Sequence, residues 1–321
     1  MKAVVCNEYG TPEVLKLIDL EKPIPKANEV LIKVHAASIN SWDWDLLRGT
    51  FINRLIFGAF RKPKLKILGA DVAGTVEAVG DSVTKFKVGE EVFGDLCAEN
   101  WGAFAEYVCA SEKALVHKPS QLKFEEVAAL PQAGVMALQS LIDKGPIKPG
   151  QTVLINGAGG GVGTYALQIA KSVTAVVTCV DKLEKLDFLK ALGADHVMDY
   201  QLHDFTKKDH SYDLVIDVVG NHSLFQYKRI LNPKGRLVLV GGTSFTLLQI
   251  GLLGPLFSIF GSKKLGLLVH EPNKNLTLLI EYLISGKIKS VIDHCCKLEQ
   301  TADAIQRIGN GTVKGKVIVL V

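Results

Sequence analysis

A glycine-rich segment is the part of the sequence best suited to chemistry. It reads VLINGAGGGVG over residues 153–163 and matches A-x-G-x-x-G from Ala158, without the first glycine of the usual dinucleotide fingerprint. Gly160 stands where backbone must approach a pyrophosphate, and Gly163 stands where a helix and a strand must pack closely. A helix that starts here would offer unpaired N–H groups and a partial positive charge to phosphates. The residues expected to form this dinucleotide-binding loop are Gly160, Gly161, Val162 and Gly163.

An acidic residue and a later glycine extend the expected site. Asp181 lies 18 residues beyond Gly163, at the end of the next predicted strand, where the hydroxyls of a bound ribose are normally met. A carboxylate there favours NAD, because it accepts both hydroxyls and repels a 2′-phosphate. Gly241 ends a later predicted strand, RLVLVGG, and is a further expected cofactor contact.

The elements around the loop alternate between strands and helices. From Gln151 onward, TVLING, AVVTCVD, HVMDY, DLVIDVVG and RLVLVGG read as short apolar strands, separated by helical stretches such as GVGTYALQIAKSV. This alternation is typical of a parallel sheet covered by helices on both faces. The first 120 residues are instead rich in short β-branched runs, with a short helix expected over residues 42–47. The pattern changes near Phe124 and again after about residue 270.

Composition limits the class of protein. A chain of 321 residues is long for one hydrophobic core, and its 48% hydrophobic and 22% charged residues are ordinary for a folded globular protein. The net charge of +4 is too small to indicate nucleic-acid binding, so we expect no nucleic-acid partner. Six cysteines without a CxxC pair, and an N-terminus that reaches charged residues too early for a secretory leader, predict a cytoplasmic protein.

One strongly apolar stretch, LLQIGLLGPLFSIF, covers residues 247–260. Its 14 residues are short for a membrane span, and Gly254-Pro255 is expected to break it internally. We therefore expect no stable membrane span, and we interpret the stretch as buried or as an interface.

Motifs in the same order as in a known family occur along nearly the whole chain. They include EVLIKVHAASIN, LGADVAGTVEAVG, KVGEEVFG, AALPQAGVMALQSL, VLINGAGGGVGTYALQIAK, LGADHVMDY and the closing GKVIVLV. The sequence thereby resembles the medium-chain dehydrogenase/reductase superfamily, and within it the zinc-free quinone oxidoreductase-like branch. The resemblance implies an α/β protein with a GroES-like β-barrel catalytic domain over 1–123 and 270–321. It also implies a Rossmann dinucleotide-binding domain over 124–269, and a homodimer formed through an edge strand of the Rossmann sheet.

The resemblance also indicates where metal ligands would stand. Zinc-using relatives carry a cysteine just after the strand that here reads KVHAASIN, and a Gly-His-Glu motif where this chain has Gly69-Ala70-Asp71. Neither the cysteine nor the histidine is present, and the closely spaced cysteines of a structural zinc lobe are missing, so we expect no metal. Without zinc, a conjugated acceptor is favoured, because conjugation spreads the negative charge that develops on oxygen.

The expected activity is therefore hydride transfer from NAD(P)H to a quinone or an α,β-unsaturated carbonyl. Two alternatives remain open at this point. One is a dehydrogenase of small alcohols and aldehydes, and the other is a non-catalytic cofactor-binding protein that acts as a partner of other molecules. No general acid is apparent in the sequence, and we expect water to deliver the proton.

The resemblance assigns roles to residues near the first short helix. Asn40 and Asp43 match the Asn-x-x-Asp that quinone oxidoreductase-like proteins place beside the nicotinamide ribose. Asn40 would orient the cofactor, with N-capping of the helix as the alternative, and Asp43 would make a polar contact in the active site. Trp44 is expected to line an aromatic substrate pocket, with plain core packing as the alternative. Met136 is a second expected lining residue, at a position where the family often has threonine.

Residues of the predicted cofactor site point to different cofactors, some to NADPH and one to NAD. Lys185 and Tyr200 stand where NADPH-using quinone oxidoreductases place a lysine and a tyrosine on the 2′-phosphate. Those relatives generally have a small residue at the position of Asp181, whose carboxylate favours NAD. The alternative for Lys185 is the solvated face of a helix. The resemblance makes NADPH the expected cofactor, with NADH as the alternative.

Overall fold

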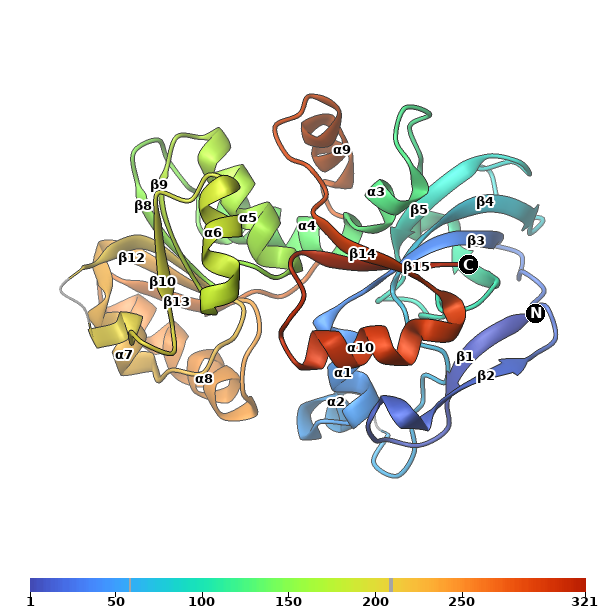
Figure 1. Cartoon of the computed structure of the whole chain (residues 1–321), viewed down its shortest axis with the longest axis horizontal. Coiled ribbons are helices and arrows are strands. Elements are labelled where there is room, and N and C mark those ends of the chain that lie inside the picture. Colours follow the sequence, from blue (N-terminus) through green and yellow to red (C-terminus); the bar gives the residue numbers. More distant parts are fainter. Residues whose placement is uncertain (58, 208–209) are drawn as a thin grey trace. The chain divides into compact units, whose positions relative to one another are not determined.

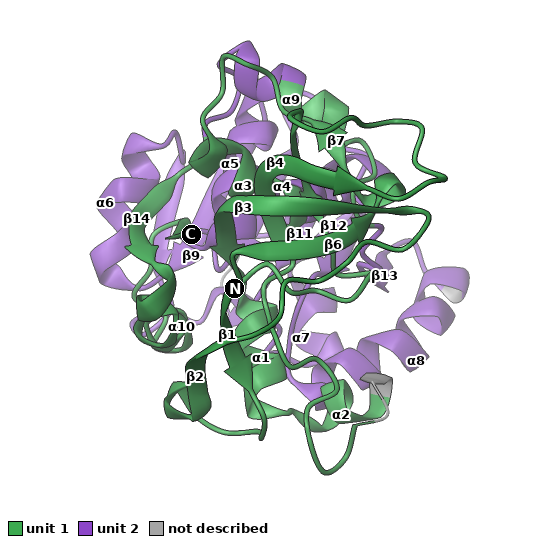
Figure 2. Cartoon of the chain, turned by 90° about the vertical axis from the view of Figure 1, so that its right-hand side faces the viewer, with its two compact units in different colours: residues 1–133, 272–280, 290–321 green, residues 134–271, 281–289 purple. Residues whose placement is uncertain are grey.

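The computed structural model describes residues 1–57, 59–207 and 210–321. The chain forms two compact units (Figure 2). Unit 1 consists of residues 1–133, 272–280 and 290–321, and unit 2 of residues 134–271 and 281–289. Both ends of the chain thus belong to unit 1, while unit 2 is formed almost entirely by the middle of the sequence.

Unit 1 is built on a seven-stranded sheet and a two-stranded one (Figure 1). The larger sheet has the order β14-β15-β3-β4-β5-β7, with β6 paired to β3, and the smaller is β1-β2. The strands are β1 Lys2–Cys6, β2 Leu15–Asp19, β3 Glu29–Ile39, β4 Asp71–Val79, β5 Glu91–Asp95, β6 Tyr107–Ser111, β7 Val116–His117, β14 Ile292–Lys297 and β15 Lys316–Leu320. The helices are α1 Ser41–Arg48, α2 Phe51–Phe57, α3 Phe124–Ala128 and α10 Thr301–Gly309.

The order of three neighbouring strands in unit 1 fixes the place of its polar residues. β3 pairs antiparallel with β4, with Ser38 opposite Asp71. On its other side β3 pairs antiparallel with β15, with Ile39 opposite Val317. The end of β3 and the starts of β4 and β15 therefore meet, although residues 39 and 317 lie at opposite ends of the chain.

Unit 2 contains a six-stranded sheet in which every described pairing is parallel. Its order is β10-β9-β8-β11-β12-β13, the 3-2-1-4-5-6 order of a doubly wound dinucleotide-binding fold. The strands are β8 Thr152–Asn156, β9 Val176–Asp181, β10 His196–Asp199, β11 Tyr212–Asp217, β12 Leu231–Leu239 and β13 Lys264–Leu267. The helices are α5 Gly161–Ser172, α6 Leu183–Ala191, α7 Leu224–Arg229 and α8 Ser244–Phe260, while α4 Pro131–Leu138 and α9 Leu276–Ile284 cross the sequence boundaries of the units.

This architecture confirms the predicted α/β class with a doubly wound parallel sheet. The short apolar strands of unit 2 are buried because the sheet is covered. Leu154 of β8, for example, packs in one cluster with Leu224, Tyr227 and Ile250 of α7 and α8. The short helix expected over residues 42–47 is α1.

The apolar stretch at residues 247–260 differs from its predicted form. It lies in α8, which continues through Pro255, so the expected internal break is wrong. A Cβ on Gly254 would lie 2.6 Å from the Leu265 carbonyl oxygen, so the glycine lets α8 lie close against β13. Ile250 is fully buried, but one side of the helix is exposed, so the stretch is buried only in part. The exposed apolar residues of this face are Phe245, Leu248, Leu252, Leu256 and Ile259.

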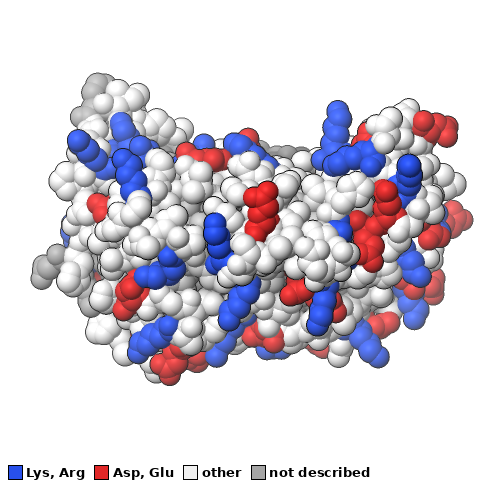
Figure 3. All heavy atoms as spheres, turned by 90° about the horizontal axis from the view of Figure 1, so that it is seen from above, with Lys and Arg blue, Asp and Glu red and all other residues white. Residues whose placement is uncertain are grey.

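No helix among residues 1–57, 59–207 and 210–321 is long and apolar enough to cross a membrane. Charged side chains of both signs are interspersed on the face drawn in Figure 3. That face therefore has no continuous basic track of the kind that binds a nucleic-acid backbone.

Candidate functional site

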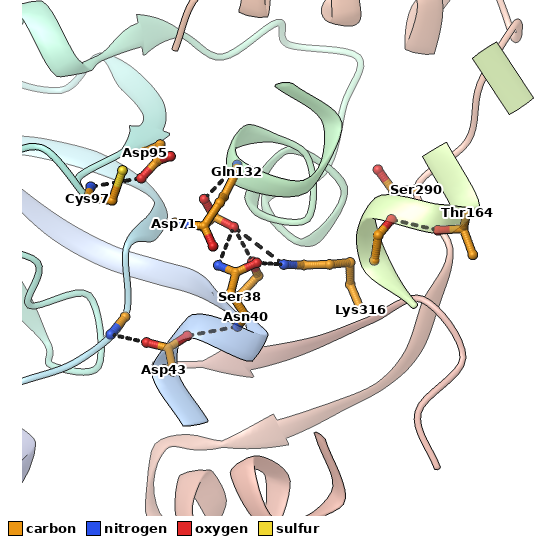
Figure 4. Close-up of polar contacts among 12 residues, drawn as sticks. Ser38, Asn40, Asp43, Asp71, Asp95, Cys97, Gln132, Thr164, Ser290 and Lys316 are labelled. Carbon is orange, nitrogen blue, oxygen red and sulfur yellow. Dashed lines mark hydrogen bonds and ion pairs between the residues drawn. The ribbon is translucent and has the colours of Figure 1, made fainter. Parts of the chain in front are cut away.

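A buried polar cluster lies in unit 1 where β3, β4 and β15 meet (Figure 4). Its centre is the Asp71 carboxylate. One oxygen, Oδ2, accepts hydrogen bonds from the Ser38 hydroxyl at 2.6 Å and from Asn40 Nδ2 at 2.9 Å, and lies 3.5 Å from Lys316 Nζ. The other oxygen accepts the backbone N–H of Gln132 at 2.9 Å. Asp71 is fully buried and Lys316 is 2% exposed, so this charge pair is held away from water.

Burial sets the ionisation tendencies of the pair. It raises the pKa of the Asp71 carboxyl and lowers the pKa of the Lys316 ammonium, because both charged forms lose their hydration. The opposite charge of each partner works against these shifts. Lys316 also donates a short hydrogen bond to Asn40 Oδ1, so the ammonium has a second oxygen partner.

Asp43 is a buried residue in the first turn of α1, and its carboxylate caps the start of this helix. Its carboxylate accepts the backbone N–H of Asn40 at 2.8 Å and that of Gly69 at 2.9 Å. Gly69 has φ +88°, and a Cβ there would lie 2.7 Å from the Phe104 ring, so only glycine suits this position. Burial raises the pKa of Asp43 to about 7, while the two N–H bonds and the charge of Lys316 oppose that rise.

Asn40 stands at the N-cap position of α1, but its side chain does not cap the helix. The amide is engaged by Asp71 and Lys316 instead, and Asp43 satisfies the N-terminal backbone. These contacts favour the functional interpretation of Asn40 over the capping alternative.

The other two residues expected near the substrate lie in different surroundings. The indole of Trp44 packs against the core of unit 1, and a Cβ on Gly309 of α10 would lie 2.5 Å from it. This is the packing role that the sequence left open for Trp44. Met136 is half-buried in α4, and its carbonyl oxygen accepts the Ser140 hydroxyl at 2.7 Å.

Sequence reasoning missed part of the buried cluster. Lys316, Gln132 and Asp71 are not among the site residues that the sequence predicts. Gln132 is 3% exposed, and among the described residues its Nε2 atom is buried without a hydrogen-bond partner. Such a donor costs about 1–3 kcal/mol of stability when it is left unpaired. The signal for Lys316 was a charged residue at the start of an otherwise apolar closing strand, GKVIVLV.

The glycine loop of unit 2 joins β8 to α5, as the sequence predicts. Gly157 has φ +80°, which starts the turn, and Gly160 occupies the N-cap of α5. A Cβ on Gly163 would lie 2.5 Å from Ala158 Cα, so this glycine permits the close packing of helix and loop. A Cβ on Gly160 would meet only the Gly157 carbonyl oxygen, at 3.5 Å, so backbone at this turn is open to an approaching group. The first N–H groups of α5 have no preceding turn to bond to, which fits a bound pyrophosphate.

Asp181, Lys185 and Tyr200 are brought together at the carboxyl ends of β9 and β10. Asp181 is paired with Asp199 in the sheet, and the N–H of Tyr200 donates to the Asp181 carbonyl oxygen at 3.2 Å. The Asp181 carboxylate accepts the N–H groups of Gly159 at 2.7 Å and of Lys182 at 2.9 Å. It therefore braces the glycine loop.

Lys185 is buried rather than solvated. It is 5% exposed and its ammonium lies 3.6 Å from Asp181, so the alternative that made it a solvated helix residue is wrong. Its stem passes close to Gly159, where a Cβ would lie 2.6 Å from Lys185 Cδ. Tyr200 is 45% exposed, which leaves its ring available to a ligand.

The loops after β11 and β12 approach each other at glycines. A Cβ on Gly241 would lie 2.6 Å from the Val218 carbonyl oxygen, so a larger residue would push the two loops apart. Asp217 holds the first loop by accepting the N–H groups of Val219 at 2.8 Å and Gly220 at 2.7 Å. Gly241 thus lets the loops after β11 and β12 lie close together at the carboxyl edge of the sheet. Ligands of such folds bind at this edge.

Two glycine substitutions separate a binding role from a packing role. We predict that Gly160→Val weakens NADPH binding by at least tenfold, roughly 1.4 kcal/mol, and leaves Tm nearly unchanged, because a Cβ there meets nothing closer than 3.5 Å. Gly163→Val should instead lower Tm, because its side chain meets the loop backbone. Titration of protein fluorescence with NADPH and thermal unfolding measure the two effects. Wild-type affinity in Gly160→Val would show that the phosphates bind elsewhere.

Asp43 should make stability depend on pH. Its pKa of about 7 in the folded protein exceeds the unfolded value of about 3.9. Its contribution is therefore complete below about pH 4 and is lost as pH rises through about 7, at up to about 1.4 kcal/mol per pH unit. Urea unfolding at pH 5, 6, 7 and 8 should show this loss in the wild type relative to Asp43→Asn. Parallel pH dependences in the two proteins would contradict the prediction.

Comparison with known proteins agrees with both halves of this description. Residues 26–120 match the model of the alcohol dehydrogenase GroES-like domain, and residues 192–319 match that of a zinc-binding dehydrogenase. The chain is 32% identical over 332 residues to a chloroplast envelope quinone oxidoreductase homolog of Arabidopsis thaliana, covering 99% of this chain and 98% of that protein. It is 33% identical over 330 residues to a 2-methylene-furan-3-one reductase of Solanum lycopersicum, covering 99% and 79%.

A solved structure gives the same result for the fold. The quinone oxidoreductase of Coxiella burnetii superimposes with a TM-score of 0.89 at 32% identity, covering 100% of this chain and 99% of that one. The predicted combination of a GroES-like domain and a Rossmann domain is therefore confirmed. The chain belongs to the medium-chain dehydrogenase/reductase superfamily, in its quinone oxidoreductase family.

Proposed function

We propose that this protein is a zinc-independent, NAD(P)H-dependent reductase of quinones and α,β-unsaturated carbonyls. The observation that carries the proposal is the buried cluster of unit 1. The chain carries no cysteine just after KVHAASIN, where zinc-using relatives have a ligand, and Ala70 stands where they have histidine. Asn40 is bonded to Lys316 and Asp71, so a positive charge is already present among these side chains.

The donor set does not suit zinc. Zinc prefers thiolate, imidazole and carboxylate ligands, and the one carboxylate of the cluster is engaged by Ser38, Asn40, Lys316 and the Gln132 backbone.

The residues of unit 2 fit a nicotinamide dinucleotide, as argued from the open backbone at Gly160 and the start of α5. When bound, this cofactor supplies the hydride. The chain's own part is to hold it and to orient it, and we assign orientation to Asn40. Asp43 holds Asn40 in place through the backbone N–H bond. The residues that we assign to cofactor binding are Asn40, Gly160, Gly161, Val162, Gly163, Asp181, Lys185, Tyr200 and Gly241.

A conjugated acceptor suits a site without a Lewis acid. In a quinone or an enone, the charge left by hydride addition spreads over several atoms, so positioning beside the cofactor supplies much of the catalysis. A simple aldehyde concentrates that charge on one oxygen and needs stronger stabilisation. The names of the two relatives, a quinone oxidoreductase homolog and a furanone reductase, point to the same class of acceptor.

Oxidation of NADPH by different acceptors tests the proposal. We predict turnover with 9,10-phenanthrenequinone and with a 2-alkenal, and little with a saturated aldehyde. Treatment with a strong chelator should leave the rates unchanged, because no metal is required. Activity confined to the saturated aldehyde, and restored by zinc after chelation, would identify an alcohol dehydrogenase. Tight cofactor binding without any turnover would identify a non-catalytic binding protein.

We further propose that NADPH is preferred over NADH. Lys185 is the side chain that supports this choice, because its ammonium is held at the ribose end of the expected site. Asp181 is less repulsive to a 2′-phosphate than its charge alone suggests, since two N–H groups stabilise the carboxylate and the Lys185 ammonium offsets its charge. The 2′-phosphate would pair with the Lys185 ammonium, and the Asp181 carboxylate would keep its hydrogen bonds from the two N–H groups.

Single substitutions of Lys185 and Asp181 test this preference. Lys185→Ala should raise KM for NADPH several-fold and leave KM for NADH nearly unchanged, since only the 2′-phosphate loses a partner. Lys190→Ala, an exposed lysine on the same helix, is the matched control. Asp181→Asn should improve NADPH relative to NADH. Equal changes for both cofactors in Lys185→Ala would mean that the lysine only braces Asp181.

We also propose a cytoplasmic homodimer. β13 is an edge strand of the unit 2 sheet, and α8, which packs on it, exposes the apolar face defined above. Exposed apolar surface of this kind is typical of an interface. A reducing compartment suits the six free thiols of the chain.

A further inference from the structure

The amide of Asn40 is held between two groups of opposite hydrogen-bonding character. Lys316 can only donate, and it donates to Oδ1. Asp71, when ionised, can only accept, and it accepts from Nδ2 at 2.9 Å. An asparagine amide has a donor side and an acceptor side of nearly the same shape, so its hydrogen-bond partners decide which way it faces. Here the ammonium on one side and the carboxylate on the other leave a single favourable orientation.

The lysine contacts Asn40 more closely than it contacts the carboxylate. Its Nζ lies 3.5 Å from Asp71 Oδ2, longer than a good charged hydrogen bond, while its bond to Asn40 is short. Asn40 bonds to both members of the pair, so the pair acts on the amide.

The same contacts determine what Asn40 can offer to a ligand. One of its two Nδ2 protons is bonded to Asp71, and Oδ1 is bonded to Lys316. The second Nδ2 proton is therefore the donor that remains for an oxygen of the cofactor or the substrate. Asp71 Oδ2 already receives the Ser38 hydroxyl, Asn40 Nδ2 and Lys316, so it has little capacity left to accept the second Nδ2 proton.

We propose that Lys316 is a positioning residue, which fixes the Asn40 amide with its nitrogen side available as a hydrogen-bond donor in the active site. This inference rests on the proposed function, since Asn40 is the residue assigned to orient the cofactor. Lys316 itself remains within the cluster and acts through Asn40. The register of β15 against β3 delivers it there, from a position 276 residues away in the chain.

A pair of substitutions separates positioning from charge balance. Lys316→Met keeps the length of the side chain but leaves the Asp71 carboxylate without its cation, so it should lower both Tm and the rate. Adding Asp71→Asn removes the stranded charge and should recover Tm. In that double variant the donor at 316 is absent and position 71 can also donate, so the Asn40 amide is no longer fixed. We predict that single-turnover NADPH oxidation by 9,10-phenanthrenequinone stays at least about tenfold below wild type.

Two further measurements show whether the effect passes through Asn40. In an Asn40→Ala background, the two substitutions at 316 and 71 should cause no additional loss of rate, because the group they position is gone. In the protein without cofactor, the NMR signals of the Asn40 side-chain amide protons should shift in the Lys316→Met/Asp71→Asn variant. The amide signals of Gln249, which bonds to Leu224 in unit 2, are the control and should stay in place.

The outcomes distinguish this inference from the proposed function. Full recovery of the rate together with Tm in the double variant would overturn positioning and leave charge balance as the role of Lys316. An unchanged Asn40 amide signal would overturn it as well, whatever the activity. A wild-type protein that oxidises NADPH with neither quinone nor alkenal would refute the proposed function, and the NMR comparison would still decide the role of Lys316.

Discussion

The ammonium of Lys316 and the carboxylate of Asp71 share a site from which water is excluded, and removing either one would leave a buried charge without compensation. Their meeting depends on the strand order β15-β3-β4, which brings the last strand of the chain against one of the first. Folding of unit 1 is thereby coupled to the assembly of its polar cluster: if β15 does not pair with β3, Asn40 loses the donor that sets its orientation. Stability and the chemistry of this unit thus depend on the same contact.

In unit 2, the backbone of the glycine loop between β8 and α5 must be open to a ligand and also held rigid. Gly160 supplies the open position, and Gly163 lets α5 pack against the loop. Asp181 braces Gly159 from the end of the neighbouring strand, and Lys185 covers that contact. A carboxylate that the sequence presents as a ribose acceptor is therefore also a structural brace. This double use explains how Asp181 and Lys185, which point to different cofactors when considered separately, coexist in one protein.

Sequence periodicity was sufficient for the parallel sheet and the glycine loop, because both depend on local patterns. The family resemblance also paired Asn40 with Asp43, through the Asn-x-x-Asp motif that two intervening residues define. The sequence could not find Lys316, because the pairing of residues 39 and 317 is not local. It could not decide whether Lys185 was solvated, because a helical lysine usually is, whereas this one is buried and paired with the Asp181 carboxylate. The sequence predicted a break at Pro255, but α8 continues through this residue and packs on β13.

The central claim is that the protein delivers hydride to a conjugated carbon without a metal. Its most direct test is the fate of the hydrogen, followed with NADPH deuterated at the transferred position, metal-depleted protein and a 2-alkenal. We predict deuterium on the β-carbon of a saturated aldehyde, with the α-hydrogen taken from water. Deuterium on the carbonyl carbon of an allylic alcohol, or no transfer until zinc is supplied, would contradict it.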